Sequence, residues 1–300
     1  MKPAVALITA REARGLDEDL PPLEAAMYAA GLETRVVDWD DPHVHWASFD
    51  VALLRSTWDY TDRLREFLAW ADSAGNVTTL LNTPQVVRWN TDKHYLRELA
   101  RVGVPVVPST FIEPGENAER SLASFLERHA SAEFVVKPSV GAGSRDTQRH
   151  VRAQLAPAVA HVQRLLHAKR SVLVQPYLES VDTDGETALI FFAGRFSHAI
   201  RKGPLLPPGS TASPAIGLFA PEKITARNPG ADELRVAGHA LAALPFAAPL
   251  YARVDLIRDT AGAPRLLELE LTEPSLFFAH ASGSAERFTA AVVEAASHTT

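Results

Sequence analysis

Residues 251–271 read YARVDLIRDTAGAPRLLELEL, two apolar strand patterns on either side of a polar turn. Alternate residues of a β-strand point to the same face, so Asp255, Glu268 and Glu270 are expected to converge across this hairpin. The leucines between the acidic residues indicate that the opposite face is core. Half-buried carboxylates need cations to neutralise them, and a set of oxygen ligands favours Mg²⁺. Taken alone, the stretch fits a solvated strand face with salt bridges to arginine equally well.

A second stretch, VVKPSVGAGS at residues 135–144, places Lys137 at the end of an apolar strand and directly before a glycine-rich turn. Glycine allows positive φ angles and leaves backbone N–H groups uncovered, which suits a cradle for phosphates. Most glycine turns only reverse the chain, so the lysine gives this interpretation most of its weight. Lysine is uncommon here, with six among 30 basic residues, and its compact ammonium suits a phosphate as a point charge.

The strand that follows ends in Gln175-Pro176-Tyr177-Leu178. Proline removes a donor from the ladder, so the chain can bend away from the sheet and offer free backbone groups to a flat ring such as adenine. Asp182 could then accept hydrogen bonds from ribose hydroxyls. Without the other motifs, the same segment is an ordinary exit from a strand.

Composition limits the classes of protein to consider. With 300 residues, 46% hydrophobic and 22% charged, the chain is globular and long enough for two or three subdomains. The net charge of −6, without a basic stripe, argues against a nucleic-acid partner. No apolar stretch suits a signal peptide or a membrane span, which predicts a soluble cytoplasmic protein. The absence of cysteine excludes disulfides and thiolate-bound metals.

Three units are expected along the chain. Residues 1–110 alternate strands and helices as an open α/β layer, residues 111–183 place two helices over a small antiparallel sheet, and residues 184–300 hold two hairpins and a closing helix. The segment 203–214, rich in proline, glycine and serine, is expected to be a mobile loop that excludes water. Ligands of open α/β sheets lie beyond the carboxyl ends of strands, which favours residues 55–60, RSTWDY, as a substrate-binding loop, although a capped turn with inward aromatics is about as good an interpretation.

In this order the motifs resemble the ATP-grasp superfamily, over residues 80–280 as motifs and over the first domain as architecture. The resemblance implies an ATP-grasp fold, α/β plus α+β, with ATP and two Mg²⁺ ions between two subdomains behind an N-terminal open α/β domain. The site residues that it implies are, for ATP, Lys93, Lys137, Ser139, Gly141, Gly143, Ser144, Gln175, Pro176, Tyr177, Leu178 and Asp182; for the metals, Asp255, Glu268 and Glu270; and for catalysis, Lys202 and Arg253. The interpretation requires the three acids to face Lys137 across a gap the size of a triphosphate. The family usually ends its metal motif in Glu-x-Asn, whereas this chain has Glu268-Leu269-Glu270, which adds negative charge at the second metal.

The resemblance implies an ADP-forming carboxylate–amine ligase that works through an acyl phosphate. The chain is similar to small bacterial ligases of antibiotic biosynthesis that close an amino-acid-like carboxylate on itself. An amino-acid or dipeptide ligase, a small-molecule kinase of the same fold and a non-catalytic nucleotide-binding module stay open, as does a homodimer. The expected substrate residues are Arg55, Ser56, Thr57, Asp59, Tyr60 and Ser275.

Overall fold

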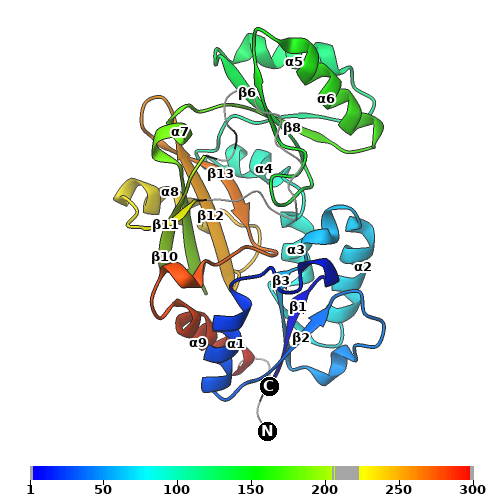
Figure 1. Cartoon of the computed structure of the whole chain (residues 1–300), viewed down its shortest axis with the longest axis vertical. Helices are drawn as coiled ribbons and strands as arrows, with labels where there is room; N and C mark the ends of the chain where they lie inside the picture. Colours follow the sequence, from blue (N-terminus) through cyan, green and yellow to red (C-terminus); the bar gives the residue numbers. More distant parts are fainter. Residues whose placement is uncertain (1–2, 205, 207–222, 298–300) are drawn as a thin grey trace.

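The structure is a computed structural model that describes residues 3–204, 206 and 223–297, and three β-sheets form its frame (Figure 1). The loop expected at 203–214 lies almost entirely outside the described residues. Among the residues described, no helix is both long and apolar enough to cross a membrane.

The first sheet is parallel, with strand order β2-β1-β3-β4. Its elements are β1 (Ala4–Thr9), η1 (Arg11–Ala13), α1 (Leu20–Ala29), β2 (Glu33–Asp38), η2 (Trp46–Ser48), β3 (Val51–Ser56), η3 (Trp58–Thr61), α2 (Leu64–Gly75) and β4 (Thr79–Leu81). Val5 and Leu7 belong to a core shared with α1, whereas Ala6 and Ile8 belong to a core shared with α2. Both faces are therefore covered, which explains why β1 and β3 are almost continuously apolar. The carboxyl end of β3 leads into residues 55–60.

The next sheet along the chain is antiparallel, with strand order β5-β8-β6-β7. This sheet and its two helices are called the lid below. Its elements are β5 (Thr110–Ile112), α5 (Ala118–Arg128), β6 (Glu133–Pro138), β7 (Gln148–Val151), α6 (Leu155–His167) and β8 (Val172–Pro176). Phe134 and Val136 pack against α5 and α6 on one face. Because side chains alternate along β6, Val135 and Lys137 point to the other face. The lid thus directs Lys137 away from its own helices, toward the rest of the molecule.

The central sheet is antiparallel, with strand order β11-β10-β9-β12-β13. Its strands are β9 (Glu186–Phe192), β10 (Arg195–Lys202), β11 (Ile224–Arg227), β12 (Tyr251–Arg258) and β13 (Pro264–Glu270), and the remaining helices are α3 (Pro84–Asn90), α4 (Tyr95–Arg101), α7 (Ser180–Asp184), α8 (Ala231–Ala242), η4 (Phe278–His280) and α9 (Ser284–Ser297). Val254, Leu269 and Leu271 share a core with α3, α4 and α8, so the leucines beside the acidic residues are core, as expected. The opposite face of β12 carries Arg253 and Asp255.

Candidate active site

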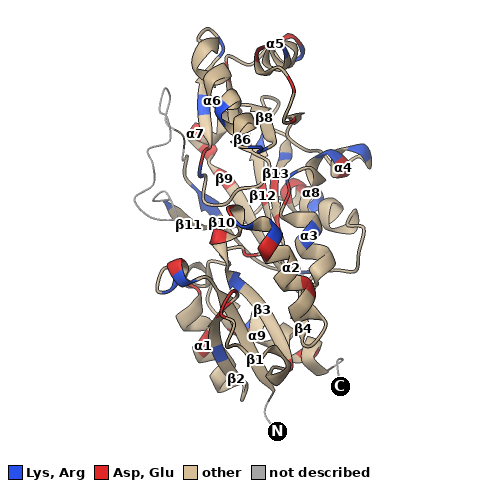
Figure 2. Cartoon of the chain, turned by 90° about the vertical axis from the view of Figure 1, so that its right-hand side faces the viewer, with Lys and Arg blue, Asp and Glu red and all other residues tan. Residues whose placement is uncertain are grey.

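The β12–β13 hairpin sets the acidic residues opposite one another. The register pairs Asp255 with Glu268 and Arg253 with Glu270, and an irregularity follows directly after Asp255. Asp255 is almost completely buried, and Glu268 and Glu270 keep about a quarter of their side chains exposed. Figure 2 shows basic and acidic residues together around β10, β12 and β13, between the lid and the first sheet. This face of the central sheet is therefore charged, while its other face is core.

Each of the three carboxylates meets a cation. Lys202 Nζ lies 2.7 Å from Asp255 Oδ2, and Lys93 Nζ lies 2.9 Å from Glu268 Oε1. Arg253 donates to both Asp255 and Glu270. Lys137 Nζ lies 3.9 Å from Glu268, closer than the triphosphate-sized gap that the sequence led us to expect. The lysines expected at the phosphates thus pair with the carboxylates expected at the metals.

These contacts shift the pKa values of the site in opposite directions. Burial alone would raise the pKa of Asp255, but Arg253 and Lys202 lower it to about 2. Burial likewise opposes ionisation of Glu268, yet its lysine neighbours hold its pKa below the usual range. The pKa of Glu270 is raised to about 7, chiefly by burial; the charges of Asp255 and Glu268 raise it further, and Arg253 opposes the rise. Glu270 thus adds a proton acceptor where the family usually has asparagine.

The glycine turn is anchored to the turn between α3 and α4. The Lys93 amide donates to the Ser139 carbonyl at 2.9 Å, and Lys93 Nζ donates to the Gly141 carbonyl at 2.8 Å. Gly143 and Ser144 have φ angles of +61° and +57°, which shows that the chain takes the left-handed conformation here. Helix α4 begins at Tyr95, so Lys93 lies in the turn that precedes it. Lys93, Ser139, Gly141, Gly143 and Ser144 therefore form one connected loop region.

The segment expected at adenine, Gln175 to Leu178, leaves the lid beside an apolar cluster that includes Val135, Ile257 and Leu267. Pro176 ends β8, Gln175 Nε2 donates to Ser109 Oγ at 2.9 Å, and the Tyr177 hydroxyl donates to Asp182 at 2.5 Å. The apolar cluster brings Val135 of the lid together with Ile257 and Leu267 of the central sheet. Val135 could have been found from the alternation that marks Lys137.

Arg149 was missed from the sequence. Its guanidinium carbon lies 3.6 Å from the ring centre of Tyr177, and it donates to Glu133 and Asp182. The register places it in one row with Val135 and Gln175. Arg149 therefore holds Asp182, the expected ribose acceptor, in an ion pair at 3.1 Å. No spacing or neighbouring motif distinguishes this arginine in the sequence.

The residues expected at the substrate are not all brought together. Arg55 is fully buried, 3.8 Å from Asp17 and 3.6 Å from Asp19, and its Nη2 donates to the Pro274 carbonyl at 3.4 Å. Its Nε and Nη1 atoms and the Thr57 hydroxyl have no hydrogen-bond partner among the described atoms. The Ser275 carbonyl accepts from Arg253 at 3.2 Å, which places this residue beside the acidic β12–β13 hairpin.

The other members of the loop diverge. Ser56 Oγ lies 2.7 Å from Thr9 Oγ1, inside the first sheet. Asp59 accepts from Trp39 at 2.8 Å and so points into the first domain, away from the acidic hairpin. Tyr60 is buried and lies beside Glu273, a residue that no motif in the sequence singles out and whose charge helps to raise the pKa of Tyr60. The loop thus contacts the 273–275 turn through hydrogen bonds from Arg55 and Trp58.

The donor set fits a metal–nucleotide complex by its chemistry. Asp255, Glu268 and Glu270 offer only carboxylate oxygens, as Mg²⁺ requires. In the described part of the chain, no three His, Asp or Glu side chains are already arranged around a common metal position. Lysine and arginine side chains form ion pairs with these oxygens instead. A phosphate-bearing ligand would therefore have to attract the lysines away from the carboxylates.

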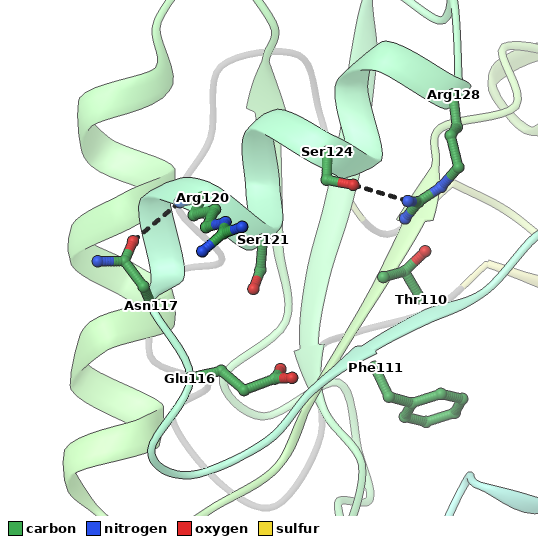
Figure 3. Close-up of a pocket in the computed structure, with 8 residues that line it drawn as sticks. All are labelled: Thr110, Phe111, Glu116, Asn117, Arg120, Ser121, Ser124 and Arg128. Atoms are coloured by element: carbon green, nitrogen blue, oxygen red, sulfur yellow. Dashed lines mark hydrogen bonds between the residues drawn. The ribbon is translucent and has the colours of Figure 1, made fainter.

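The hollow in Figure 3 is separate from these residues. It has a volume of about 450 Å³ and is lined by β5 and α5, including Thr110, Ser121 and Arg120. Arg128 donates to Ser124 at 2.7 Å at its rim. It shares no residue with the charged site, where the ion pairs of Glu268 with Lys93 and Lys137 close the space between lid and central sheet.

Known proteins resemble the chain in sequence and in fold. Residues 5–82 match the family model described as the N-terminal domain of D-cycloserine synthetase DcsG. The cycloserine biosynthesis protein DcsG of Streptomyces lavendulae is 42% identical over 97% of this chain and 98% of its own length. The crystal structure of D-cycloserine synthetase DcsG, 41% identical, has a TM-score of 0.91 over 98% of this chain and 99% of that chain.

More distant structures share the fold. The D-alanine–D-alanine ligase of Bacillus anthracis has a TM-score of 0.68 at 14% identity, over 99% of this chain and 98% of that chain. The ATP-grasp ligase PsnB, in a complex with Mg and ADP, has a TM-score of 0.66 at 18% identity, over 97% of this chain and 98% of that chain. These findings confirm the expected ATP-grasp fold class. The chain therefore has the ATP-grasp fold and belongs to the D-cycloserine synthetase family.

Proposed function

We propose that this ligase converts O-ureido-D-serine to D-cycloserine through an acyl phosphate. The observation that carries the proposal is the charged hairpin, in which Asp255, Glu268 and Glu270 face Lys93, Lys202 and Arg253. The identity with the Streptomyces lavendulae protein supports the choice of substrate.

The first step forms the acyl phosphate. A carboxylate oxygen of the substrate attacks the γ-phosphorus of ATP, and the bond from phosphorus to the bridging oxygen breaks, which releases ADP. Lys93, Lys137 and Lys202 would leave their carboxylates and spread the negative charge of the transferring group. Asp255, Glu268 and Glu270 would hold two magnesium ions, which would supply further charge neutralisation.

The second step closes the ring. The nitrogen bonded to the side-chain oxygen attacks the acyl carbon, loses its proton, and displaces phosphate as the carbon–oxygen bond breaks. Arg253, which already reaches Asp255 and the Ser275 carbonyl, would stabilise the tetrahedral oxyanion. The product ring lacks the carbamoyl group, so atom balance requires this group to leave with one water as carbamate.

The proposal assigns the remaining contacts as the sequence suggested. Adenine would lie between the apolar cluster of Val135, Ile257 and Leu267 and the backbone of Gln175 to Leu178. The glycine turn would hold the phosphates, and Asp182 would accept from the ribose after release from Arg149. Arg55, Thr57, Tyr60 and Ser275 would line the substrate side of the site.

The direct test incubates the purified chain with Mg-ATP and O-ureido-D-serine. We expect ADP and D-cycloserine in equal amounts, and hydroxylamine should trap the acyl phosphate as a hydroxamate. Asp255→Asn should abolish both products, while Glu294→Gln, which breaks an exposed ion pair with Arg195, should leave them unchanged. A stable phosphoester would instead indicate a kinase, and ADP formation only with paired amino acids would indicate a dipeptide ligase.

A further inference from the structure

Glu273 is a buried carboxylate three residues beyond the metal motif. Only 8% of the residue is exposed, and within the described part of the chain no lysine, arginine or histidine forms an ion pair with it. Asp255, Glu268 and Glu270, by contrast, each have a cation within ion-pair distance. A buried carboxylate without a counter-ion is costly to ionise, so such a residue calls for a functional explanation.

The loop after β3 fixes Glu273 in place. The Tyr60 side chain lies beside its carboxylate and opposes the rise of its pKa, and Trp58 Nε1 donates to its backbone carbonyl at 3.3 Å. Arg55 donates to the neighbouring Pro274 carbonyl at 3.4 Å but leaves its buried Nε and Nη1 without partners. Two independent features therefore flank the same turn: a carboxylate without a counter-ion and arginine N–H groups without acceptors.

This turn also borders the reacting groups. Arg253 donates to the Ser275 carbonyl at 3.2 Å and pairs with Glu270, so the 273–275 turn lies beside the residue proposed to hold the oxyanion. Burial and the nearby charge of Glu270 raise the pKa of Glu273 to about 8. A positively charged group on a bound ligand would counteract both effects and lower the pKa of Glu273 again.

We infer that Glu273, supported by Tyr60, binds the ammonium group of an α-amino-acid substrate whose carboxylate lies at Arg253. In an α-amino acid the ammonium nitrogen is two bonds from the carboxyl carbon, so adjacent recognition points are needed. Arg253 and the 273–275 turn supply such points. The inference rests on the proposed function, because it takes the reacting carboxylate to be that of an amino acid.

The test compares O-ureido-D-serine with 3-(ureidooxy)propanoate, which lacks only the ammonium group. Wild type should prefer the amino compound in kcat/KM by roughly 100-fold, as expected for a desolvated charge pair. Glu273→Gln should remove most of this preference, with the KM for ATP within about threefold of wild type. The matched control, Glu294→Gln, should keep the preference. An equal loss for both compounds, or no loss, would overturn the inference.

Two further measurements keep the outcomes separate. If Glu273→Gln does not fold, Glu273→Asp moves the carboxylate by one methylene and should reduce the preference in part; an unchanged preference contradicts the inference. If wild type forms no ADP with either compound, the proposed function has failed. Calorimetric titration with D-serine and 3-hydroxypropanoate then tests ammonium recognition separately. Wild type should bind D-serine selectively, and Glu273→Gln should abolish this selectivity. Any other result opposes the inference.

Discussion

Glu273 should make the stability of the protein depend on pH. Its pKa of about 8 in the folded chain exceeds the ordinary value of 4.5, so the folded state binds more protons than the unfolded state between these limits. Stability from this group is therefore complete below pH 4.5 and falls as the pH rises toward 8. Glu273→Gln should abolish that fall.

The measurement is urea unfolding at pH 5 and pH 8. We expect Glu273→Gln to gain on the order of 1–3 kcal/mol relative to wild type between the two pH values, since one pKa unit corresponds to about 1.4 kcal/mol. A difference between variant and wild type that does not change with pH would show that Glu273 is not the titrating group.

Glu268 connects both halves of the charged site. Glu268→Gln removes the partner of Lys93 and Lys137 and one of the proposed metal ligands. We expect the rate of ADP formation to fall by roughly 10²- to 10³-fold, the usual effect of losing one electrostatic element of a phosphoryl-transfer site. A rate within threefold of wild type, measured in a coupled ADP assay, would remove Glu268 from the site.

The sequence identifies those charged residues whose neighbours in the chain form a recognisable pattern. Asp255, Glu268 and Glu270 alternate with core residues, and Lys137 precedes a glycine turn. Glu273 follows the strand and has no such alternation, so only the three-dimensional structure shows that it is buried beside Tyr60. Arg149 is likewise defined by contacts between strands rather than by its neighbours in the chain.

Strand β13 lies at the edge of the central sheet, and side chains satisfy part of its backbone. Asn90 accepts from the Leu271 amide and donates to the Leu269 carbonyl, both at 2.7 Å. Asn90→Ala should lower the free energy of unfolding by roughly 2–4 kcal/mol, because two buried backbone groups lose their partners. Urea unfolding measures this, with the exposed Asn76→Ala as the control. A loss equal to that of the control would show that the amide is dispensable.

Gly185 joins α7 to β9 with a φ angle of +69°, and a Cβ atom there would collide with the Lys202 carbonyl oxygen. Gly31 has a φ of +82°, and no atom lies within 4 Å of the position that a Cβ atom would take there, so Gly31→Ala is a matched control for backbone strain. Gly185→Ala should cost about 1–3 kcal/mol more than Gly31→Ala, as overpacking does. It should also lower kcat by displacing Lys202. Equal unfolding midpoints would contradict the collision.

The hairpins and the lid were predictable because their apolar periods are strong, whereas the start of α4 was not. The Lys93 amide bonds the Ser139 carbonyl instead of entering the helix, and His94 pairs with Asp92 and Glu113. The contacts with Ser139 and Glu113 are distant in the sequence and override local helix preference. The parallel bridge between Val106 and Leu266 could not be foreseen for the same reason.

The two ends of the chain meet in one core, which the order of elements in the sequence does not reveal. Helix α9 packs against α1, and Phe288 lies 5.8 Å from the ring of Tyr251 on β12. Tyr251 in turn donates to the Thr272 carbonyl at 2.9 Å, just before Glu273. The first sheet, the last helix and the β12–β13 hairpin therefore pack together and jointly support the site (Figure 1).

Every acidic side chain on the hairpin is paired with a lysine or an arginine. This pairing affects the order in which metal and nucleotide bind. A free divalent ion would have to compete with ammonium and guanidinium groups that are already in place, without any phosphate to attract them elsewhere. We therefore expect Mg²⁺ alone to bind more than tenfold more weakly than Mg-ADP in calorimetric titration. Metal and nucleotide should enter as one complex, and tight uptake of the bare ion would exclude that order of addition.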